Sequence, residues 1–330
     1  MKNEDPLVTP LSILDARRRI APHVLRTPIR HSDWLSRETG GNIFLKLESI
    51  QPTGSFKIRG AFNFAIKHAA GSPHVPVVTA SAGNQGRALA YAAARLGLRA
   101  IVHAPETAPS TKLDAIRALG AELRLWPDYD AAEREAKRHA AEAGVPYLSP
   151  FSHPDIVAGA GTVALEILED LPDVDLIVVP VGGGGLVSGI GIAAKAATRD
   201  IEVVGVEVEA SHPFTDGLAA GRIVPIRVGP SLADGLVGNL DPDTITFDLA
   251  RRVVDRFVLA GEDGLRRGIR GLLAEEHLVA EGAGSVGVVA LLDRRIPVEG
   301  RRVAAIVSGA NIDMSALEEI AMDHREGRGA

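Results

Sequence analysis

The chain lacks cysteine altogether and is poor in aromatic residues. Without cysteine it can form no disulfide, no thiolate metal site and no cysteine nucleophile. Phe, Trp and Tyr make up only 4% of the 330 residues, whereas Ala, Val, Leu, Ile and Gly are abundant. This composition is typical of buried parallel strands packed against helices.

Basic residues are not in excess either. The 36 Lys and Arg residues are mixed along the chain with 42 Asp and Glu residues, and the net charge is -6. Because nucleic-acid binding depends on a basic stripe, we expect no nucleic-acid partner. No apolar run has transmembrane length and the first residues lack the apolar core of a signal peptide, so we expect a cytoplasmic protein without membrane contact. The ten histidines show no ligand spacing, and we predict no metal site.

Short apolar runs alternate with amphipathic segments of helical length, which is the pattern of an α/β protein with parallel strands. Strands are predicted at 42–48, 75–79, 99–103, 122–126, 175–181, 202–208, 253–258 and 302–307. Helices are predicted at 84–96 before Gly97, at 110–119 before Gly120, and at 155–171.

A chain of this length predicts two domains or one large α/β unit. The segments 48–54 and 146–150 are candidate crossings between two domains. Residues 49–148 would then form a smaller inserted α/β domain, and 1–48 with 149–330 the larger one, with a ligand in the cleft between them. Residues 325–330 are expected to be disordered.

Four consecutive glycines, Gly182, Gly183, Gly184 and Gly185, separate a predicted strand from a helical segment. Bare backbone amides at a helix N-terminus bind anions, and the entropic cost of four glycines needs a reason, so the loop predicts a phosphate site. The spacing departs from the dinucleotide pattern Gly-x-Gly-x-x-Gly, and no Gly-Lys-Ser/Thr follows. Glu207 lies where a dinucleotide fold would carry its acid, so a nicotinamide oxidoreductase stays open as an alternative.

A second motif surrounds Lys57. The turn and N-cap residues Thr53, Gly54 and Ser55 place Lys57 in a first helical turn beside apolar Phe56. Both the helix N-terminus and an apolar setting lower the pKa of a lysine, and these are conditions for a nucleophilic amine. On this motif alone an ordinary surface lysine stays open as the alternative.

Two further motifs also follow predicted strands, where open α/β sheets bind their ligands. In the first, the Ser81 hydroxyl, the Asn84 amide and free backbone amides can bind a carboxylate or a phenolic oxygen, or can simply cap a helix. The second, Ser308-Gly309-Ala310-Asn311, is by itself a turn.

The order of these four motifs closely resembles the pyridoxal-phosphate (PLP) enzymes of fold type II, in particular the threonine and serine dehydratases. Segments 233–236 and 280–284, which contain Gly235 and Glu281, are similar to two further active-site segments of that family. The resemblance spans nearly the whole chain. It implies two open, twisted, mainly parallel sheets with flanking helices, an active site between the domains, and a homodimer or homotetramer.

The resemblance also implies a role for each motif residue. Lys57 forms the Schiff base with PLP, Phe56 packs against its ring, and Asn84 bonds its phenolic oxygen. Ser308 bonds the pyridine nitrogen, while Gly235 and Glu281 complete the cofactor site. The phosphate is held by the backbone of Gly182, Gly183, Gly184, Gly185 and Leu186. The carboxylate of a small amino-acid substrate is held by the loop of Ser81, Ala82, Gly83, Asn84 and Gln85.

Single positions discriminate within the family. Cysteine and threonine synthases generally carry Asp after the lysine, whereas this chain has Ile58, which favours a dehydratase. Serine racemases have a proton-transferring Ser where this chain has Ala82, so racemisation is not expected as the main activity. Gln85 replaces the usual His and Ala310 the usual Gly, and both leave the substrate open. No C-terminal regulatory domain is expected, because the chain ends soon after the serine motif.

Some family members bind a cation through a glutamate after the glycine loop. Glu207 or Glu209 could supply that carboxylate, but Pro213 stands where a further acid is expected, so a solvated strand end is favoured.

We therefore expect a lyase that converts a β-hydroxy amino acid, L-threonine or L-serine first, into a 2-oxo acid and ammonia. In this reaction the amine of Lys57 removes the Cα proton, and the neutral Ser308 hydroxyl makes the ring a weaker electron sink, which favours prompt loss of the hydroxyl. The open alternatives are other substrates (3-hydroxyaspartate, phenylserine or an amino acid derived from hydroxyectoine), a serine racemase, and a PLP-binding protein without activity.

Overall fold

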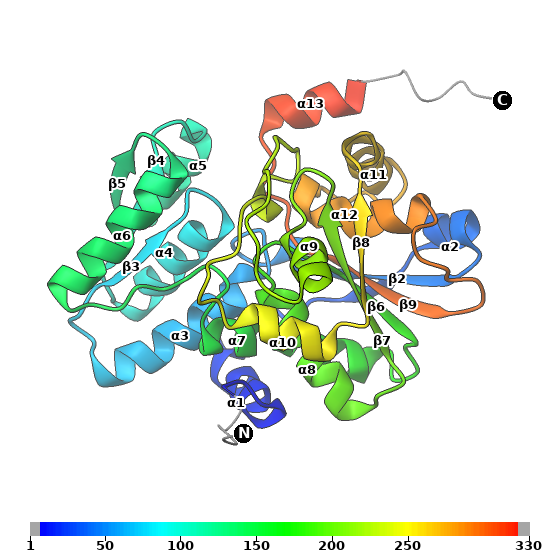
Figure 1. The fold of residues 1–330 in the computed structure, drawn as a ribbon, viewed down its shortest axis with the longest axis horizontal. Helices are drawn as coiled ribbons and strands as arrows, with labels where there is room; N and C mark the ends of the chain where they lie inside the picture. Colours follow the sequence, from blue (N-terminus) through cyan, green and yellow to red (C-terminus); the bar gives the residue numbers. More distant parts are fainter. Residues whose placement is uncertain (1–6, 323–330) are drawn as a thin grey trace.

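Two separate β-sheets form the framework of the protein (Figure 1). The computed structural model describes residues 7–322. Within them the larger sheet has six strands in the order β1-β2-β9-β6-β7-β8, parallel except that β1 runs antiparallel to β2. The smaller sheet has three parallel strands in the order β3-β4-β5. The α/β fold with two mainly parallel sheets is therefore confirmed.

The strands are β1 (Ile29–His31), β2 (Asn42–Leu47), β3 (Val77–Ala80), β4 (Ala100–Pro105), β5 (Glu122–Trp126), β6 (Leu176–Pro180), β7 (Glu202–Val208), β8 (Arg256–Ala260) and β9 (Arg302–Val307). The α-helices are α1 (Pro10–Ile20), α2 (Asp33–Thr39), α3 (Lys57–Gly71), α4 (Asn84–Leu96), α5 (Ser110–Ala118), α6 (Tyr129–Ala143), α7 (Pro154–Asp170), α8 (Gly185–Ala197), α9 (Pro213–Ala220), α10 (Thr246–Val253), α11 (Glu262–Ala274), α12 (Gly282–Leu292) and α13 (Met314–Met322). Two short 3₁₀ turns, η1 (Glu48–Ile50) and η2 (Asp234–Leu236), lie between them.

Both faces of the larger sheet are buried. Successive side chains of a strand point to opposite faces, so Ile177 and Val179 of β6 pack on the side of α7 and α8, while Leu176 and Val178 pack on the side of α12. Burial on both faces explains why this strand is a continuous apolar run rather than an alternating one.

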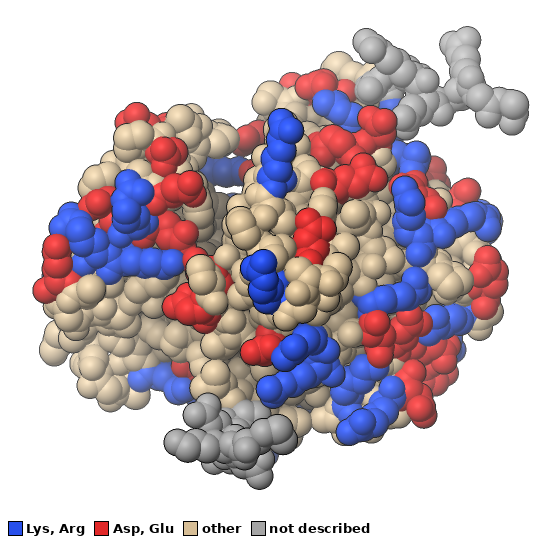
Figure 2. Space-filling model, in the orientation of Figure 1, with Lys and Arg blue, Asp and Glu red and all other residues tan. Residues whose placement is uncertain are grey.

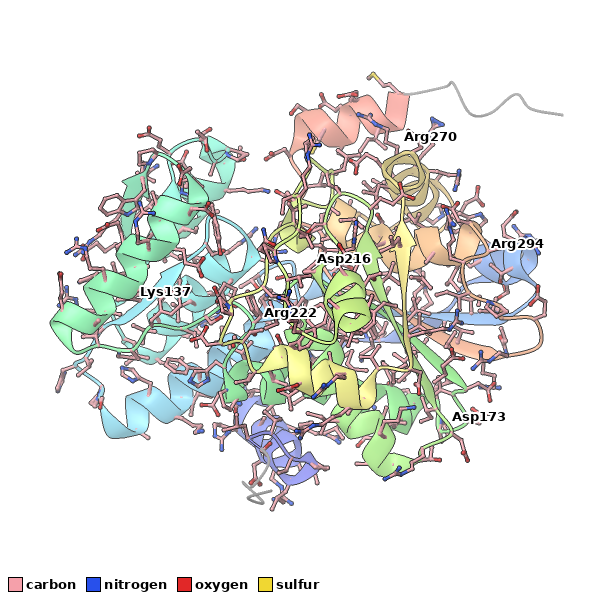
Figure 3. All side chains as sticks on the ribbon, viewed as in Figure 1. Lys137, Asp173, Asp216, Arg222, Arg270 and Arg294 are labelled. Carbon is pink, nitrogen blue, oxygen red and sulfur yellow. The ribbon has the colours of Figure 1, made fainter. Side chains whose placement is uncertain are left out.

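The smaller sheet has helices of its own. Helix α6 contacts all three of its strands, while α4 and α5 contact β3, β4 and β5 and each other. These elements lie on the left in Figure 1, and all fall within residues 49–148. Lys137 on α6, labelled in Figure 3, joins them to the rest of the chain through an ion pair of 3.1 Å with Asp241.

Four buried charged side chains hold α3 in place. The guanidinium of Arg59 on α3 donates to both oxygens of Glu48, each at 2.7 Å, and to Glu166 of α7 at 2.7 Å. Lys46 of β2 donates to the other Glu166 oxygen at 2.6 Å. All four are at most 5% exposed, and their two positive and two negative charges balance. The first turn of α3, which carries Lys57, is thereby fixed against β2 and α7.

Most of the predicted elements are confirmed. Helix α4 has the predicted bounds and ends at Gly97, whose φ of 68° is the left-handed value that glycine adopts most readily. Every predicted strand is present, but β8 begins at Arg256, because residues up to Val253 belong to α10. The three-residue strand β1 was too short to predict. The predicted disorder at 325–330 lies outside the described residues.

The N-cap prediction for Ser55 is wrong. Lys57 lies in the first turn of α3 as predicted, but the N-cap is Phe56, which makes no side-chain capping bond. The hydroxyl of Ser55 is buried without a hydrogen-bond partner among the described residues. Its backbone instead forms a β-bridge with Gly309.

The surface carries charges of both signs. Figure 2 shows Lys and Arg interspersed with Asp and Glu over the visible face. Among residues 7–322, no helix has the length and apolar character to cross a membrane.

Candidate active site

A cavity of about 1040 Å³ lies between the smaller sheet with its helices and the loops of the larger sheet. It brings together residues from every predicted motif, although they are spread over more than 250 positions from Phe56 to Ser308. The predicted site residues that line it are Phe56, Lys57, Ser81, Ala82, Gly83, Asn84, Gln85, Gly182, Gly183, Gly235, Glu281 and Ser308. Gly184, Gly185 and Leu186 do not line it; they follow Gly183 along the chain as the N-cap and first residues of α8.

Lys57 presents its amine to this cavity from the first turn of α3. Its Nζ donates to the carbonyl oxygen of Pro150 at 2.7 Å and lies 5.2 Å from the centre of the Phe56 ring. Burial lowers the pKa of Lys57 to about 8, although the nearby Glu281 carboxylate favours the charged amine. A substantial fraction of this lysine is therefore a neutral nucleophile at mildly alkaline pH.

The glycine loop joins β6 to α8. Gly184 has a φ of 80°, and a Cβ there would lie 2.3 Å from the Phe214 ring. A Cβ on Gly183 would lie 2.1 Å from the Phe151 ring, so neither position accepts a side chain without rearrangement. Because α8 begins at Gly185, the first amides of that helix have no intrahelical acceptor. The loop is a bare-backbone cradle suited to an anion.

The Ser81 to Gln85 loop connects β3 to α4. The Ser81 hydroxyl accepts from the Gly83 amide at 3.2 Å, and Gly83 is the N-cap of α4 without a side-chain bond. Gln85 is 2% exposed, and neither end of its amide has a partner among the described residues. This leaves free amides and an unsatisfied side-chain amide beside the cavity.

Asn84 is held between two side chains. Its Nδ2 donates to Oε1 of Glu281 at 2.6 Å, and its Oδ1 accepts from Nδ2 of Asn311 at 2.6 Å. Burial raises the pKa of Glu281 to about 7, although the hydrogen bond from Asn84 favours its charged form.

Ser308 follows β9 and is 4% exposed. Its backbone carbonyl accepts from the amide of Phe56 at 3.0 Å, and its hydroxyl lies 3.4 Å from the carbonyl of Ala283. The serine motif is thus tied directly to the lysine motif. Gly235 lies in η2 on the cavity wall, beside Asp234, which pairs with Lys112 of α5 at 2.5 Å.

Glu207 has a different place from the one predicted. It is fully buried at the end of β7, and its carboxylate accepts from the Phe214 amide at 2.8 Å and from the amide and hydroxyl of Thr215 at 2.9 and 2.6 Å. It therefore bonds the first amides of α9, so the prediction of a solvated strand end is wrong for Glu207, whereas Glu209 is exposed as predicted. A nicotinamide site would need the Glu207 carboxylate for the ribose, but both of its oxygens are bonded to Phe214 and Thr215, so the oxidoreductase alternative is wrong as well.

Among the cavity residues that sequence reasoning did not mark are Pro150, Phe151 and Arg87. The carbonyl of Pro150 accepts from Lys57, and the ring of Phe151 packs against Gly183, but no sequence motif marks either residue. Arg87 stands in the first turns of α4, three residues after Asn84, and this spacing on one helix face could have indicated it.

The sequence profile of the family described as pyridoxal-phosphate dependent enzyme matches residues 20–309. The chain belongs to this family. The fold and the cofactor expected from the motifs are thereby confirmed.

Related PLP enzymes cover nearly the whole chain. The L-threonine ammonia-lyase of Thermotoga maritima is 40% identical over 315 residues, which are 95% of this chain and 78% of that protein. The catabolic L-threonine dehydratase of Escherichia coli K12 is 36% identical, over 93% and 94% of the two chains. Among solved structures, maize serine racemase superposes with a TM-score of 0.88 at 31% identity, covering 95% and 96%. The processed form of threonine deaminase isoform 2 from Solanum lycopersicum also has a TM-score of 0.88 at 31% identity, covering 94% and 90%.

The residues of the cavity fit PLP. The cofactor has an aldehyde, a phosphate, a phenolic oxygen and a pyridine nitrogen. The cavity offers an amine of lowered pKa at Lys57, the bare backbone of Gly182 and Gly183, and polar groups at Asn84 and Ser308.

Proposed function

We propose that this PLP enzyme is a dehydratase, or ammonia-lyase, of a β-hydroxy amino acid. L-threonine and L-serine are the first candidates, with a 2-oxo acid and ammonia as products. The observation that carries the proposal is the amine of Lys57, which has a pKa of about 8 and shares the cavity with the amides of the Ser81 loop. The names of the relatives from Thermotoga maritima and Escherichia coli support the same chemistry.

The cofactor would be held by the motif residues. Lys57 would attach it covalently, and Phe56 would pack against its ring. Asn84 would donate to the phenolic oxygen and Ser308 would bond the pyridine nitrogen, with Gly235 and Glu281 enclosing the ring. Its phosphate would be bound by backbone amides of Gly182, Gly183, Gly184, Gly185 and Leu186. When bound, PLP supplies an electron sink for the bond that breaks at Cα of the substrate.

The protein's own groups would position the substrate and move its proton. The substrate carboxylate would be bound at the start of α4 by the amides and polar side chains of Ser81, Gly83, Asn84 and Gln85. Once released from the cofactor, the neutral amine of Lys57 would take the Cα proton as a general base. Its lowered pKa serves this role, because an ordinary lysine is almost wholly protonated near neutral pH.

Ala82 argues against racemisation as the main activity. A racemase needs a second proton-transferring group on the face of the substrate opposite the lysine, and the methyl group of Ala82 carries no such proton. Dehydration needs only one group that removes the Cα proton, and Lys57 supplies it. The structural likeness to maize serine racemase keeps racemisation as the second candidate.

The domain division and the assembly are part of the same proposal. Residues 49–148 would form the smaller domain and 1–48 with 149–330 the larger one, supported by the position of the three-stranded sheet within 49–148. By family resemblance the enzyme would be a cytoplasmic homodimer or homotetramer acting on a small amino acid.

The test is a substrate panel. Ammonia and 2-oxo acid are measured with threonine, serine, threo-3-hydroxyaspartate, phenylserine and a hydroxyectoine-derived amino acid, and recovered serine is analysed for chirality. Lys57→Ala should abolish release, whereas Lys67→Ala, which removes an exposed lysine of the same helix, should leave it unchanged. No keto acid from any substrate would overturn the proposal. Racemised serine without keto acid would establish the second candidate instead.

Borohydride reduction tests the attachment point. The visible band of the bound cofactor should become fixed to a single peptide that contains Lys57. A label on another lysine would contradict the assignment. A coloured protein that turns over nothing would indicate PLP binding without activity.

A further inference from the structure

Four side chains on the cavity wall form one continuous chain of hydrogen bonds. Nη1 of Arg87 donates to Oδ1 of Asn311, and Nδ2 of Asn311 donates to Oδ1 of Asn84. Nδ2 of Asn84 then donates to Oε1 of Glu281. Each of the three distances is 2.6 Å. The chain runs from α4 through the segment after β9 to the N-cap of α12, so three distant segments meet in it.

The chemistry of the outer groups fixes the direction of this chain. A guanidinium has only donors, so Arg87 requires the oxygen end of the Asn311 amide. A backbone carbonyl only accepts, and the carbonyl of Thr53 takes a second bond from Nδ2 of Asn311 at 2.9 Å. With both ends of Asn311 assigned, its Nδ2 meets Asn84, which must present Oδ1 there and Nδ2 on the opposite side.

Glu281 by itself would not hold Asn84 in this orientation. An ionised carboxylate accepts from Nδ2, but a protonated one can donate to Oδ1 equally well. Burial and the nearby Asp234 raise the pKa of Glu281, while the hydrogen bond from Asn84 and the charge of Lys112 lower it, and the result is about 7. Both forms of Glu281 therefore occur near neutral pH. The charge of Glu281 also raises the pKa of the nearby Lys57 amine. A second restraint on Asn84 is therefore needed.

We propose that Asn311 is a positioning residue that, held by Arg87 and the Thr53 carbonyl, keeps the Nδ2 of Asn84 directed at the cofactor's phenolic oxygen in both protonation states of Glu281. This inference rests on the proposed contact between Asn84 and that oxygen. An amide N–H stabilises an ionised phenolic oxygen, whereas a carbonyl oxygen in its place repels it. Asn311 thus keeps an N–H donor at the phenolic oxygen whichever form Glu281 takes.

The test replaces Asn311 with an isosteric acceptor. In Asn311→Asp, the carboxylate still accepts from Arg87 but repels Oδ1 of Asn84, so the Asn84 amide turns over. The turned amide is compatible with protonated Glu281 and is opposed by its ionised form. The visible band of the bound cofactor should therefore become pH-dependent, losing the ionised-phenol form as pH falls through the pKa of Glu281, which is about 7 in the wild type and is raised above that by the added carboxylate. The wild-type band should stay constant over the same range.

Two further variants separate orientation from added charge. Asn239→Asp places the same negative charge on the wall of the same cavity, at a residue bonded to Ile226 and outside the chain of bonds, and should leave the band unchanged. Asn311→Leu adds no charge but removes the restraint on Asn84, so its cofactor band should become pH-dependent like that of Asn311→Asp. For both Asn311 variants kcat should fall at least about tenfold with KM within about twofold, because positioning at the reacting ring acts on the chemical step.

The band is measured without substrate, so its outcome does not depend on which amino acid the enzyme converts. A pH-independent band in Asn311→Asp, or an equal response in Asn239→Asp, would overturn the inference. If neither Asn311 variant folds, Arg87→Met tests the inference, because it removes one of the two restraints on Asn311. Its band should show a smaller pH dependence, and Arg87→Lys should restore the wild-type band. A wild-type band in Arg87→Met would then overturn the inference.

Discussion

The amine of Lys57 donates a hydrogen bond of 2.7 Å to the carbonyl oxygen of Pro150. This contact joins the first turn of α3 to the segment that leads into α7, 93 positions further along the chain. A backbone carbonyl holds the amine in place without adding a carboxylate that would raise its pKa. The lysine therefore stays ordered while its pKa remains near 8.

The first prediction concerns the pH dependence of cofactor attachment. Only a neutral amine attacks an aldehyde, and burial lowers the pKa of Lys57 to about 8. The rate at which the apoenzyme takes up PLP should rise with pH and reach half its limit near pH 8. Stopped-flow absorbance would measure this rate. A midpoint near the ordinary lysine value would show that the amine is not desolvated.

The second prediction concerns the glycine cradle. In Gly183→Ala the new methyl group meets the Phe151 ring, and overpacking of this kind costs about 1–3 kcal/mol. When the loop shifts to relieve this contact, its amides leave the positions that would bind the phosphate, so the affinity for PLP should fall, at most by the about 150-fold that 3 kcal/mol represents. Gly97→Ala is the control, because its φ of 68° is also strained but no atom lies within 4 Å of its Cβ. That variant should lose stability and keep its affinity for PLP, as measured by fluorescence titration.

The third prediction concerns the buried charges below α3. Arg59→Met leaves Glu48 and Glu166 with only Lys46 to balance them, so unfolding free energy in urea should fall by about 3–5 kcal/mol. The double variant Arg59→Met/Glu48→Gln restores the balance of charge and should be more stable than Arg59→Met. If the double variant shows the sum of the two single losses, the charges act independently of one another.

The same cluster predicts a loss of stability in acid. Burial disfavours the charged form of Glu48, but the ion pair with Arg59 outweighs it and lowers the pKa of Glu48 in the folded protein. A lowered folded pKa contributes stability above the unfolded pKa that is lost as pH falls through the folded one. Wild-type stability should therefore decline in acid more steeply than that of the double variant, which denaturant titrations at several pH values would show.

The fourth prediction concerns Ala82. In Ala82→Ser a hydroxyl enters the cavity that Lys57 also lines, and it can carry a proton to the second face of the substrate. Recovered serine should then contain D-serine, detected by chiral chromatography, while keto-acid release persists. Ala82→Gly changes the size of the side chain without adding a proton donor and should form none. Equal racemisation in both variants would mean that space, and not the hydroxyl, limits the second proton transfer.

Local sequence patterns predicted the motifs correctly where the structure depends on neighbouring residues. The bounds of α4, the place of Lys57 in the first turn of α3 and the turn after β6 follow from turn residues, glycine conformations and apolar periodicity over a few residues. The N-cap prediction at Ser55 failed because its backbone pairs with Gly309, a contact 254 positions away that no local pattern carries.

Glu207 shows the same limit. Its position near the end of β7 is compatible in sequence with a dinucleotide acid, a cation ligand and a solvated strand end, of which the sequence favours the last. Only the return of the chain at α9 decides among them, because the amides of Phe214 and Thr215 take up both carboxylate oxygens.

By itself the sequence determined eight of the nine strands, the helices α4, α5 and α7, the bare-backbone loop at 182–185 and the reactive lysine, because each depends on residue types and spacings within one segment. The tertiary structure alone decided which polar groups meet. Asn84, Glu281 and Asn311 are up to 227 positions apart and are joined in one cavity only when the sheets and helices pack. The pKa of Lys57 has the same origin, since burial is a property of the folded chain and not of the segment.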